Sequence, residues 1–245
     1  MIKPIYEPKG KAKEYGDYCV NIYTGCNHGC EYCFAPSVLH KTREQFERVT
    51  VRPGLIEALD HQLKHEDFKG KLIHLCFTCD PYPAPPVDTG HTRDVVSMLK
   101  EAGCHVQILT KGGLRAERDF DLLDGEDWFG ITLSGDESKE PNAASENERL
   151  VSLEKAHIIG VNTWVSFEPV YTPAEVYEAL AAAEFIDLFR IGKLNYHPSD
   201  INWDEFGREC ERLAMQYGRR IYIKDDLRRA MERSVELVKA ESRRE

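Results

Sequence analysis

The sequence has no run of the roughly 18 to 20 consecutive apolar residues that a membrane-spanning helix needs. Its start, Met1-Ile2-Lys3-Pro4, lacks the apolar core of a signal peptide, and no low-complexity linker or short internal repeat follows. Disorder is disfavoured by 42% hydrophobic and 30% charged residues, the balance of a globular protein. We therefore expect a cytoplasmic protein of one domain over residues 1–245, with its core at about 18–200 and a C-terminal strand and helices at 201–245.

Positive charge is also in deficit, because 32 Lys and Arg face 42 Asp and Glu and leave a formal charge of −10. Such a chain repels the phosphates of a nucleic acid at long range, so nucleic-acid contact would require a local basic patch. Basic clusters do occur at Lys9-Lys11-Lys13 and near the C-terminus. The charge therefore disfavours binding of duplex DNA without excluding it.

Short β-branched or aromatic segments alternate along the chain with segments of helical periodicity. The predicted strands are 18–23, 72–78, 106–110, 128–133, 162–167, 188–191 and 220–223. Predicted helices follow Pro53, run from an N-cap at Thr92 to near Gly103, and cover 119–123, 146–158, 174–183, 203–217 and 224–245. This order favours six or seven βα units with parallel strands, in a barrel or partial barrel that binds ligands at the carboxyl ends of its strands.

Three of the eight cysteines follow the first predicted strand closely. Cys26, Cys30 and Cys33 have the spacing C-x3-C-x2-C, and Gly25 and Gly29 give the loop freedom to wrap around something small. Without an export signal, such thiols more often bind metal than form disulfides. Three thiolates on a four-iron cluster leave one iron open to a small molecule. The spacing therefore favours an open metal site.

A structural zinc site is the alternative interpretation of these cysteines. Zinc would need a fourth ligand, which His28, His40 or another cysteine would provide. The chain would then be a zinc-stabilised binding module without catalytic chemistry. The two interpretations predict different metals.

The cysteine loop resembles the radical S-adenosylmethionine (SAM) superfamily, in which an aromatic residue precedes the last cysteine as Tyr32 does here. Within that superfamily the chain is similar to the spore photoproduct lyase-like branch. Short stretches between residues 10 and 170 carry this resemblance: Gly10-Lys11-Ala12, Glu14-Tyr15-Gly16, Thr78-Cys79-Asp80-Pro81-Tyr82, Thr110-Lys111-Gly112, Arg118-Asp119, Thr132-Leu133-Ser134, Glu140-Pro141 and Phe167-Glu168-Pro169.

The resemblance implies a partial (β/α)6-type TIM barrel, here with a short N-terminal extension and a C-terminal helix. It implies a [4Fe-4S] cluster on Cys26, Cys30 and Cys33, with SAM chelating the open iron. An external electron donor of the flavodoxin or ferredoxin kind would drive cleavage of SAM to a 5′-deoxyadenosyl radical, which abstracts hydrogen from a substrate. By this analogy the substrate is a nucleobase or nucleotide. Radical modification of a peptide or small metabolite is the alternative.

The resemblance also implies a set of SAM-binding residues. Their expected partners are the adenine for Tyr32, the amino group for Thr78 and Asp80, the carboxylate for Lys111 and Arg149, and the ribose for Ser134; Glu168 is a further site carboxylate. Each also has an ordinary structural interpretation, such as a turn, a helix surface or a cap.

Cys76 and Cys79 flank the expected SAM pocket. The lyase uses a cysteine in this neighbourhood to donate hydrogen to the product radical, so the resemblance makes both residues catalytic candidates. The remaining thiols, Cys19, Cys104 and Cys210, fall in predicted strands or helices and are expected to be buried and inert.

The chain departs from the lyase in two places. Phe34, which has no hydroxyl group, stands where the lyase has a tyrosine after its third cluster cysteine. The lyase grips duplex DNA with a C-terminal hairpin, whereas a helix is predicted at 224–245 here. The resemblance therefore predicts the reaction class and leaves the substrate open.

Overall fold

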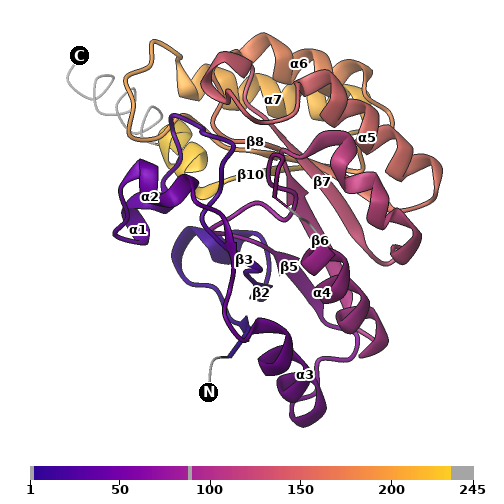
Figure 1. Cartoon of the computed structure of the whole chain (residues 1–245). Coiled ribbons are helices and arrows are strands. Elements are labelled where there is room, and N and C mark those ends of the chain that lie inside the picture. The colour runs from indigo at the N-terminus through magenta and orange to yellow at the C-terminus, as the bar shows by residue number, and fades with distance from the viewer. Residues whose placement is uncertain (1–2, 88–89, 233–245) are drawn as a thin grey trace, which may run out of the picture. The chain divides into compact units, whose positions relative to one another are not determined.

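The structure is a computed structural model that describes residues 3–87 and 90–232 (Figure 1). Contacts divide the chain into two compact units: residues 1–131 with 137–163, and residues 132–136 with 164–245. The division falls within two strands, β7 (Trp128–Leu133) and β8 (Asn162–Phe167). The single-domain organisation stays a prediction.

Unit 1 is built on a sheet with the strand order β1-β2-β5-β6-β7. Strand β1 pairs antiparallel with β2, whereas β2, β5, β6 and β7 are parallel. The elements of this unit, besides β7, are β1 (Ile5–Tyr6), η1 (Gly10–Glu14), β2 (Tyr18–Val20), β3 (Tyr23–Thr24), α1 (Ala35–Val38), α2 (Arg43–Glu47), β4 (Thr50–Val51), α3 (Leu55–His65), β5 (Leu72–Leu75), α4 (Gly90–Glu101), β6 (His105–Thr110), η2 (Gly113–Leu122), η3 (Glu137–Lys139) and α5 (Glu146–Ile158).

The parallel strands β5 and β6 are buried on both faces; one face is apolar, and the other carries His74 and Gln107, which hydrogen-bond each other. Ile73 and Leu75 of β5 and Val106 and Ile108 of β6 are fully buried. Helix α3 packs against α4, and α5 packs against η2. Because the strands are parallel, their carboxyl ends meet at one edge of the sheet, and the loops that follow β5 and β6 lie there together.

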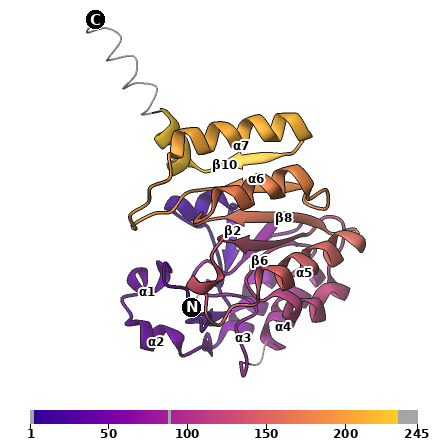
Figure 2. The ribbon, with the colours of Figure 1, turned by 90° about the horizontal axis from the view of Figure 1, so that it is seen from above.

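Unit 2 contains the parallel strands β8, β9 (Leu188–Ile191) and β10 (Ile221–Ile223) in that order. Helices α6 (Pro173–Ala182) and α7 (Trp203–Tyr217) lie side by side in both views (Figures 1 and 2). Helix α7 begins at the N-cap Asn202, whose side chain accepts a hydrogen bond from the Glu205 N–H, and ends at Gly218 in the left-handed conformation. In the described residues of both units, no helix is long and apolar enough to cross a membrane.

Several predicted elements are confirmed at their predicted ends, including strands 128–133, 162–167 and 188–191 and helices 146–158 and 203–217. The segment 119–123 is instead the end of the 3-10 helix η2. Residues 225–232 are helical, and the rest of the predicted C-terminal helix lies outside the described residues.

Two predictions at chain reversals are wrong. The predicted strand 18–23 is two strands, β2 and β3, because Asn21 leaves the first ladder and accepts hydrogen bonds from the backbone N–H groups of Phe77 and Thr78. Thr92 is not an N-cap but lies inside α4, fully buried, where its hydroxyl donates to the Pro81 carbonyl at 2.6 Å.

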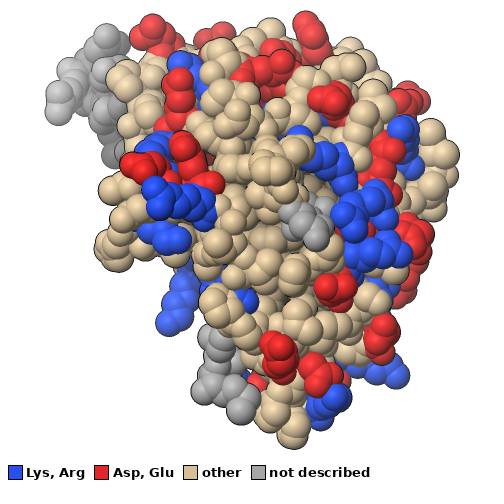
Figure 3. All heavy atoms as spheres, in the orientation of Figure 1, with Lys and Arg blue, Asp and Glu red and all other residues tan. Residues whose placement is uncertain are grey.

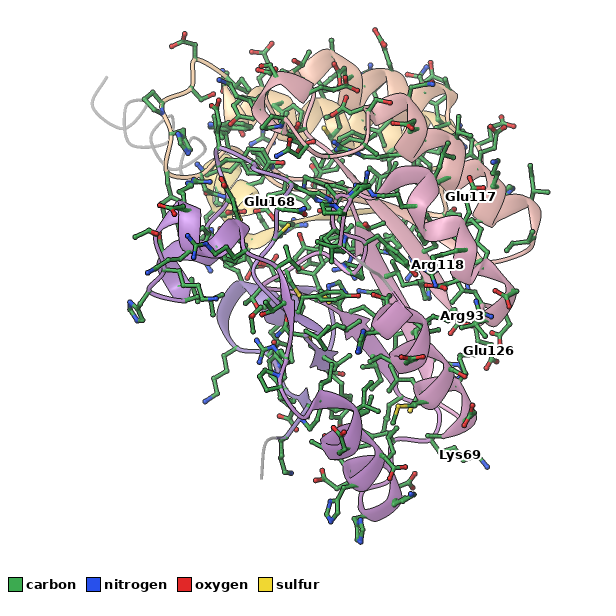
Figure 4. The ribbon with its side chains drawn as sticks, in the orientation of Figure 1. Lys69, Arg93, Glu117, Arg118, Glu126 and Glu168 are labelled. Carbon is green, nitrogen blue, oxygen red and sulfur yellow. The ribbon has the colours of Figure 1, made fainter. Side chains whose placement is uncertain are left out.

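Basic side chains gather on the right of the view in Figure 3, bordered by acidic ones. Two basic side chains of unit 1 form ion pairs: Arg93 with Asp121 at 2.6 Å, and Lys155 with Glu117 at 2.8 Å. Figure 4 labels Arg93 and Glu117 on this side of the molecule. Their positive charge is therefore largely neutralised by neighbours.

Candidate functional site

The cysteine loop follows β3 and is held against α2. The Cys26 N–H donates to the Phe46 carbonyl at 2.8 Å, and Gly25 has a φ of +92°. A Cβ at Gly25 would lie 2.8 Å from the Arg48 carbonyl oxygen and closer still to that of Phe46, so no larger residue fits. Arg43 of α2 donates to the carbonyls of Cys30, at 2.6 Å, and Glu31. The loop backbone is therefore held by contacts with α2.

All three cysteines of the motif line one small hollow, together with Gly29, Arg43, Phe46 and Glu47. The cysteines are free thiols. Burial raises the pKa of Cys26 well above its ordinary value and raises the pKa of Cys30 to about 11. Thiols in such a place ionise only when a cation compensates their charge, and three sulfur donors around a hollow suit an iron–sulfur cluster.

Neither histidine of the zinc alternative lines this hollow. His28 is buried, with Nδ1 3.5 Å from an oxygen of Asp80 and Nε2 3.1 Å from Arg115. Burial lowers the pKa of His28, so it stays neutral between these groups. Both ring nitrogens therefore have partners elsewhere, and the donor set at the hollow fits an open cluster better than a closed zinc site.

Asp80 ties the carboxyl ends of β5 and β6 together. Its Oδ1 accepts hydrogen bonds from the Tyr82 N–H at 2.8 Å and the Thr110 hydroxyl at 2.6 Å. Its Oδ2 accepts one from the Lys111 N–H at 2.8 Å. This carboxylate therefore fixes the backbone that carries Lys111.

A buried carboxylate, Glu140, joins three of the predicted SAM-binding residues. It accepts a hydrogen bond from the Tyr32 hydroxyl and forms an ion pair with Arg149, and the Lys111 Nζ lies 3.9 Å from its Oε1. Glu140 is 3% exposed and Arg149 0%. Burial raises the pKa of Glu140, but the charges of Lys111 and Arg149 outweigh this effect and the pKa is lowered. Glu140 is therefore ionised at neutral pH.

The two cations of this cluster are engaged to different degrees. Arg149 also donates from Nε to the Ala144 carbonyl at 2.8 Å, so its guanidinium is held on two sides. The Lys111 ammonium contacts Glu140 only at the outer limit of an ion pair and lies 5.6 Å from the centre of the Tyr32 ring. The family resemblance includes Glu140-Pro141 but implies no role for Glu140. The missing signal was its partner Tyr32, 108 positions away.

The turn after β5 carries both catalytic candidates. Cys76 has a left-handed φ of +72°, and its thiol interacts with that of Cys79. Cys76 is 6% exposed, and burial raises its pKa well above the ordinary value, whereas Cys79 is partly exposed. Between them, the Thr78 hydroxyl is buried without a hydrogen-bond partner in the described structure. A buried hydroxyl of this kind fits an absent polar ligand.

The other two predicted residues belong to unit 2. Ser134 lies at the end of β7 and is 2% exposed; its carbonyl accepts a hydrogen bond from the Tyr171 N–H at 2.8 Å. Glu168 follows β8, where Figure 4 labels it, and pairs with the buried Lys224 and with the Asn195 amide at 3.5 Å. Ser134 and Glu168 thus have partners of their own inside unit 2.

Comparison with known proteins gives a consistent family. The family model of the radical SAM superfamily matches residues 20–186. Among solved structures, spore photoproduct lyase complexed with dinucleoside spore photoproduct is similar with a TM-score of 0.66 and 14% identity, over 89% of this chain and 78% of that one. SuiB of Streptococcus suis bound to S-adenosylmethionine is similar with a TM-score of 0.61 and 12% identity, over 84% and 49%. These likenesses confirm the predicted α/β fold of the partial-barrel kind.

Two uncharacterized relatives match this chain over only part of their length. An uncharacterized protein of Mycobacterium tuberculosis is 30% identical over 115 residues, which cover 43% of this chain and 32% of the relative. One of Methanocaldococcus jannaschii is 26% identical over 162 residues, which cover 62% of this chain and 60% of the relative. The chain spans about a third of the mycobacterial relative.

Proposed function

Because the chain belongs to the radical SAM superfamily, we propose that it is a radical enzyme whose substrate is a nucleobase or nucleotide. The enzyme class and the cofactors, a [4Fe-4S] cluster and SAM, follow from the family. When bound, the cofactors supply a carbon-centred radical that abstracts hydrogen from a substrate. The part of this chain is to hold them, keep water away and aim the chemistry.

The observation that carries the proposal is the set of three cysteines around one hollow. Cys26, Cys30 and Cys33 are the proposed cluster ligands, and the residues that line the hollow include no fourth cysteine or histidine. One iron would then be left for SAM. The packing of Gly25 against α2 holds the loop ready before the cluster arrives.

For the carboxylate of SAM we propose Lys111 rather than Arg149. Arg149 is fully buried and neutralises Glu140, so moving it would leave a buried carboxylate uncompensated. Lys111 has only a 3.9 Å contact to the same carboxylate, and Asp80 fixes its backbone. Arg149 is therefore proposed to neutralise Glu140, and Lys111 is proposed to bind SAM.

Tyr32 and Thr78 complete the proposed SAM contacts in unit 1. Burial keeps the Tyr32 phenol protonated by raising its pKa, and its hydroxyl donates to Glu140, which holds the ring for contact with adenine. The buried Thr78 hydroxyl would accept a hydrogen bond from the amino group of SAM. The roles expected of Ser134 and Glu168 stay predictions, and Cys76 or Cys79 remains the proposed hydrogen donor.

Two observations bear on the substrate. A solved lyase of similar fold holds a dinucleoside photoproduct. The charge of −10 and the ion-paired Arg93 and Lys155 of unit 1 favour a nucleotide-sized substrate over duplex DNA. A cytoplasmic location and an electron donor of the flavodoxin or ferredoxin kind belong to the same proposal.

The test starts from anaerobically reconstituted protein. We expect a brown protein with about four irons per chain and release of 5′-deoxyadenosine from SAM under dithionite, lost in Cys30→Ala. The matched control is Cys104→Ala, a buried thiol of unit 1 outside the hollow, which keeps both properties. A colourless protein with one zinc per chain and no deoxyadenosine would overturn the proposal. Deoxyadenosine release stimulated by peptides and not by nucleotides would overturn the substrate class alone.

A further inference from the structure

The turn Cys76-Phe77-Thr78-Cys79 is a C-x-x-C sequence outside the cluster motif. Closely spaced cysteine pairs of this kind undergo thiol–disulfide exchange in many proteins. We propose that Cys76 and Cys79 form a reversible disulfide, which makes the carboxyl end of β5 a site of oxidation by small disulfides such as oxidised glutathione.

The backbone holds the two thiols together. Cys76 has the left-handed φ of +72°, which is rare for a residue with a side chain and reverses the chain directly after β5. Its N–H donates to the Val20 carbonyl at 2.9 Å. The Asn21 side chain accepts from the next two N–H groups, at 2.9 and 3.0 Å. The backbone N–H groups of residues 76, 77 and 78 are thus all held, and the two thiols at positions 76 and 79 interact.

The two thiols differ in access. Cys79 is partly exposed, so a small disulfide in solution reaches it first. Cys76 is 6% exposed and touches Cys79 from the interior. This arrangement makes Cys79 the attacking thiol and Cys76 the resolving thiol.

The exchange balances in two steps. The Cys79 thiolate attacks one sulfur of the small disulfide, whose S–S bond breaks and releases one small thiol. The Cys76 sulfur then attacks Cys79 Sγ, the Cys76–Cys79 bond forms, and the second small thiol leaves. Two electrons pass from the cysteine pair to the small disulfide, and the two protons of the pair end on the released thiols.

The consequence for catalysis rests on the proposed function. If either thiol is the hydrogen donor, the disulfide removes both S–H bonds and product formation stops until the pair is reduced. The proposal itself does not require that role.

The positions of the trypsin sites place both cysteines of the proposed disulfide in one peptide. Trypsin cleavage after Lys71 and Arg93 releases peptide 72–93, in which Cys76 and Cys79 are the sole cysteines. Reconstituted holoenzyme is treated anaerobically with oxidised glutathione, and its free thiols are blocked with N-ethylmaleimide. The protein is then digested with trypsin, and the masses of the peptides are measured. We expect peptide 72–93 to lose two hydrogen atoms and to carry neither glutathione nor N-ethylmaleimide.

Variants separate the two thiols. Cys76→Ser should stop at a stable glutathione adduct on Cys79, and Cys79→Ser should leave Cys76 largely unmodified because it is buried. Cys104→Ser is the matched control and should keep the disulfide.

A stable glutathione adduct on the wild-type peptide, or a peptide that stays reduced because Cys79 binds the cluster, would overturn the proposal. Iron and zinc are measured in the same samples, so a disulfide found in an iron-free protein would overturn the proposed function and leave this inference standing.

Discussion

Replacing Glu140 by glutamine isolates the charge at the centre of the proposed SAM site. Glutamine keeps the shape of the side chain and an oxygen for the Tyr32 hydroxyl, but it leaves the fully buried Arg149 without its carboxylate. Breaking a buried ion pair by removing one partner costs about 3–5 kcal/mol. We therefore expect Glu140→Gln to lower the free energy of unfolding by that amount, measured by urea denaturation under anaerobic conditions.

The double variant Glu140→Gln/Arg149→Met tests whether the uncompensated charge is the cause. Removing both charges should be less destabilising than Glu140→Gln alone, because an apolar side chain replaces the stranded cation. Glu117→Gln is the control: its ion pair with Lys155 is 2.8 Å long but part-exposed, so its loss should cost less than about 1 kcal/mol. A double variant no more stable than Glu140→Gln would refute the reasoning.

The pH dependence of the same variant follows from the sign of the pKa shift. The folded-state pKa of Glu140 is below its ordinary value of 4.5, because Lys111 and Arg149 outweigh the effect of burial. The stability it contributes is fully present above that ordinary value and is lost as the pH falls through the lowered folded-state pKa. The stability difference between wild type and Glu140→Gln should therefore shrink in acid. A difference that stays constant from about pH 7 to pH 3 would contradict an ionised Glu140.

Three further variants test the scaffold of unit 1. Gly25→Ala should prevent iron loading because its Cβ has no room, whereas Gly16→Ala, which points into open space, should load normally; equal iron contents would contradict this view of the loop. Asn21→Ala should cost about 2–4 kcal/mol in urea denaturation because two backbone N–H groups of the β5 turn lose their acceptor, and Asn21→Asp should recover most of it. Tyr82→Phe removes the hydroxyl that donates to the fully buried Asp119 at 3.0 Å and should cost about 1–3 kcal/mol; an unchanged urea midpoint would show that this hydrogen bond is not needed.

The longer elements were predictable because their signals are local. Strand β8 is a run of β-branched and aromatic residues and is almost wholly buried, so its limits appear in the sequence. Helix α5 begins at a capping box in which Ser145 and Glu148 bond reciprocally, and the sequence marks that start. The short elements α1, β1 and β4 escaped prediction because tertiary contacts, rather than periodicity, define them. Helix α2 also begins at a capping box, formed by Thr42 and Gln45, but its 5 residues are too few to show a helical periodicity.

The candidate site likewise has features that local sequence predicts and features that only tertiary contacts define. The cysteine motif is contained in eight consecutive residues, so its spacing alone predicted an open metal site, and the family comparison agrees with it. The predicted N-cap at Thr92 failed because the hydroxyl that would cap a helix found a tertiary acceptor, the Pro81 carbonyl, instead. A polar side chain near an element boundary has several available partners, and sequence distance does not say which one it takes.

Asp80 and Glu140 show what sequence pattern could not decide. Both are carboxylates in stretches that carry the family resemblance, and the first was expected to bind SAM while the second received no role. In the structure the Asp80 oxygens accept hydrogen bonds from the Thr110 hydroxyl and two backbone N–H groups. Glu140 instead lies next to two cations, Lys111 and Arg149, from different elements. Three accepted hydrogen bonds occupy most of the acceptor positions of the Asp80 carboxylate, and its contact with the amino group of SAM stays a prediction. The charge at this site is therefore set by Glu140, whose partners Tyr32, Lys111 and Arg149 come from three separate segments of the chain, and a single chain without its fold could not have identified it.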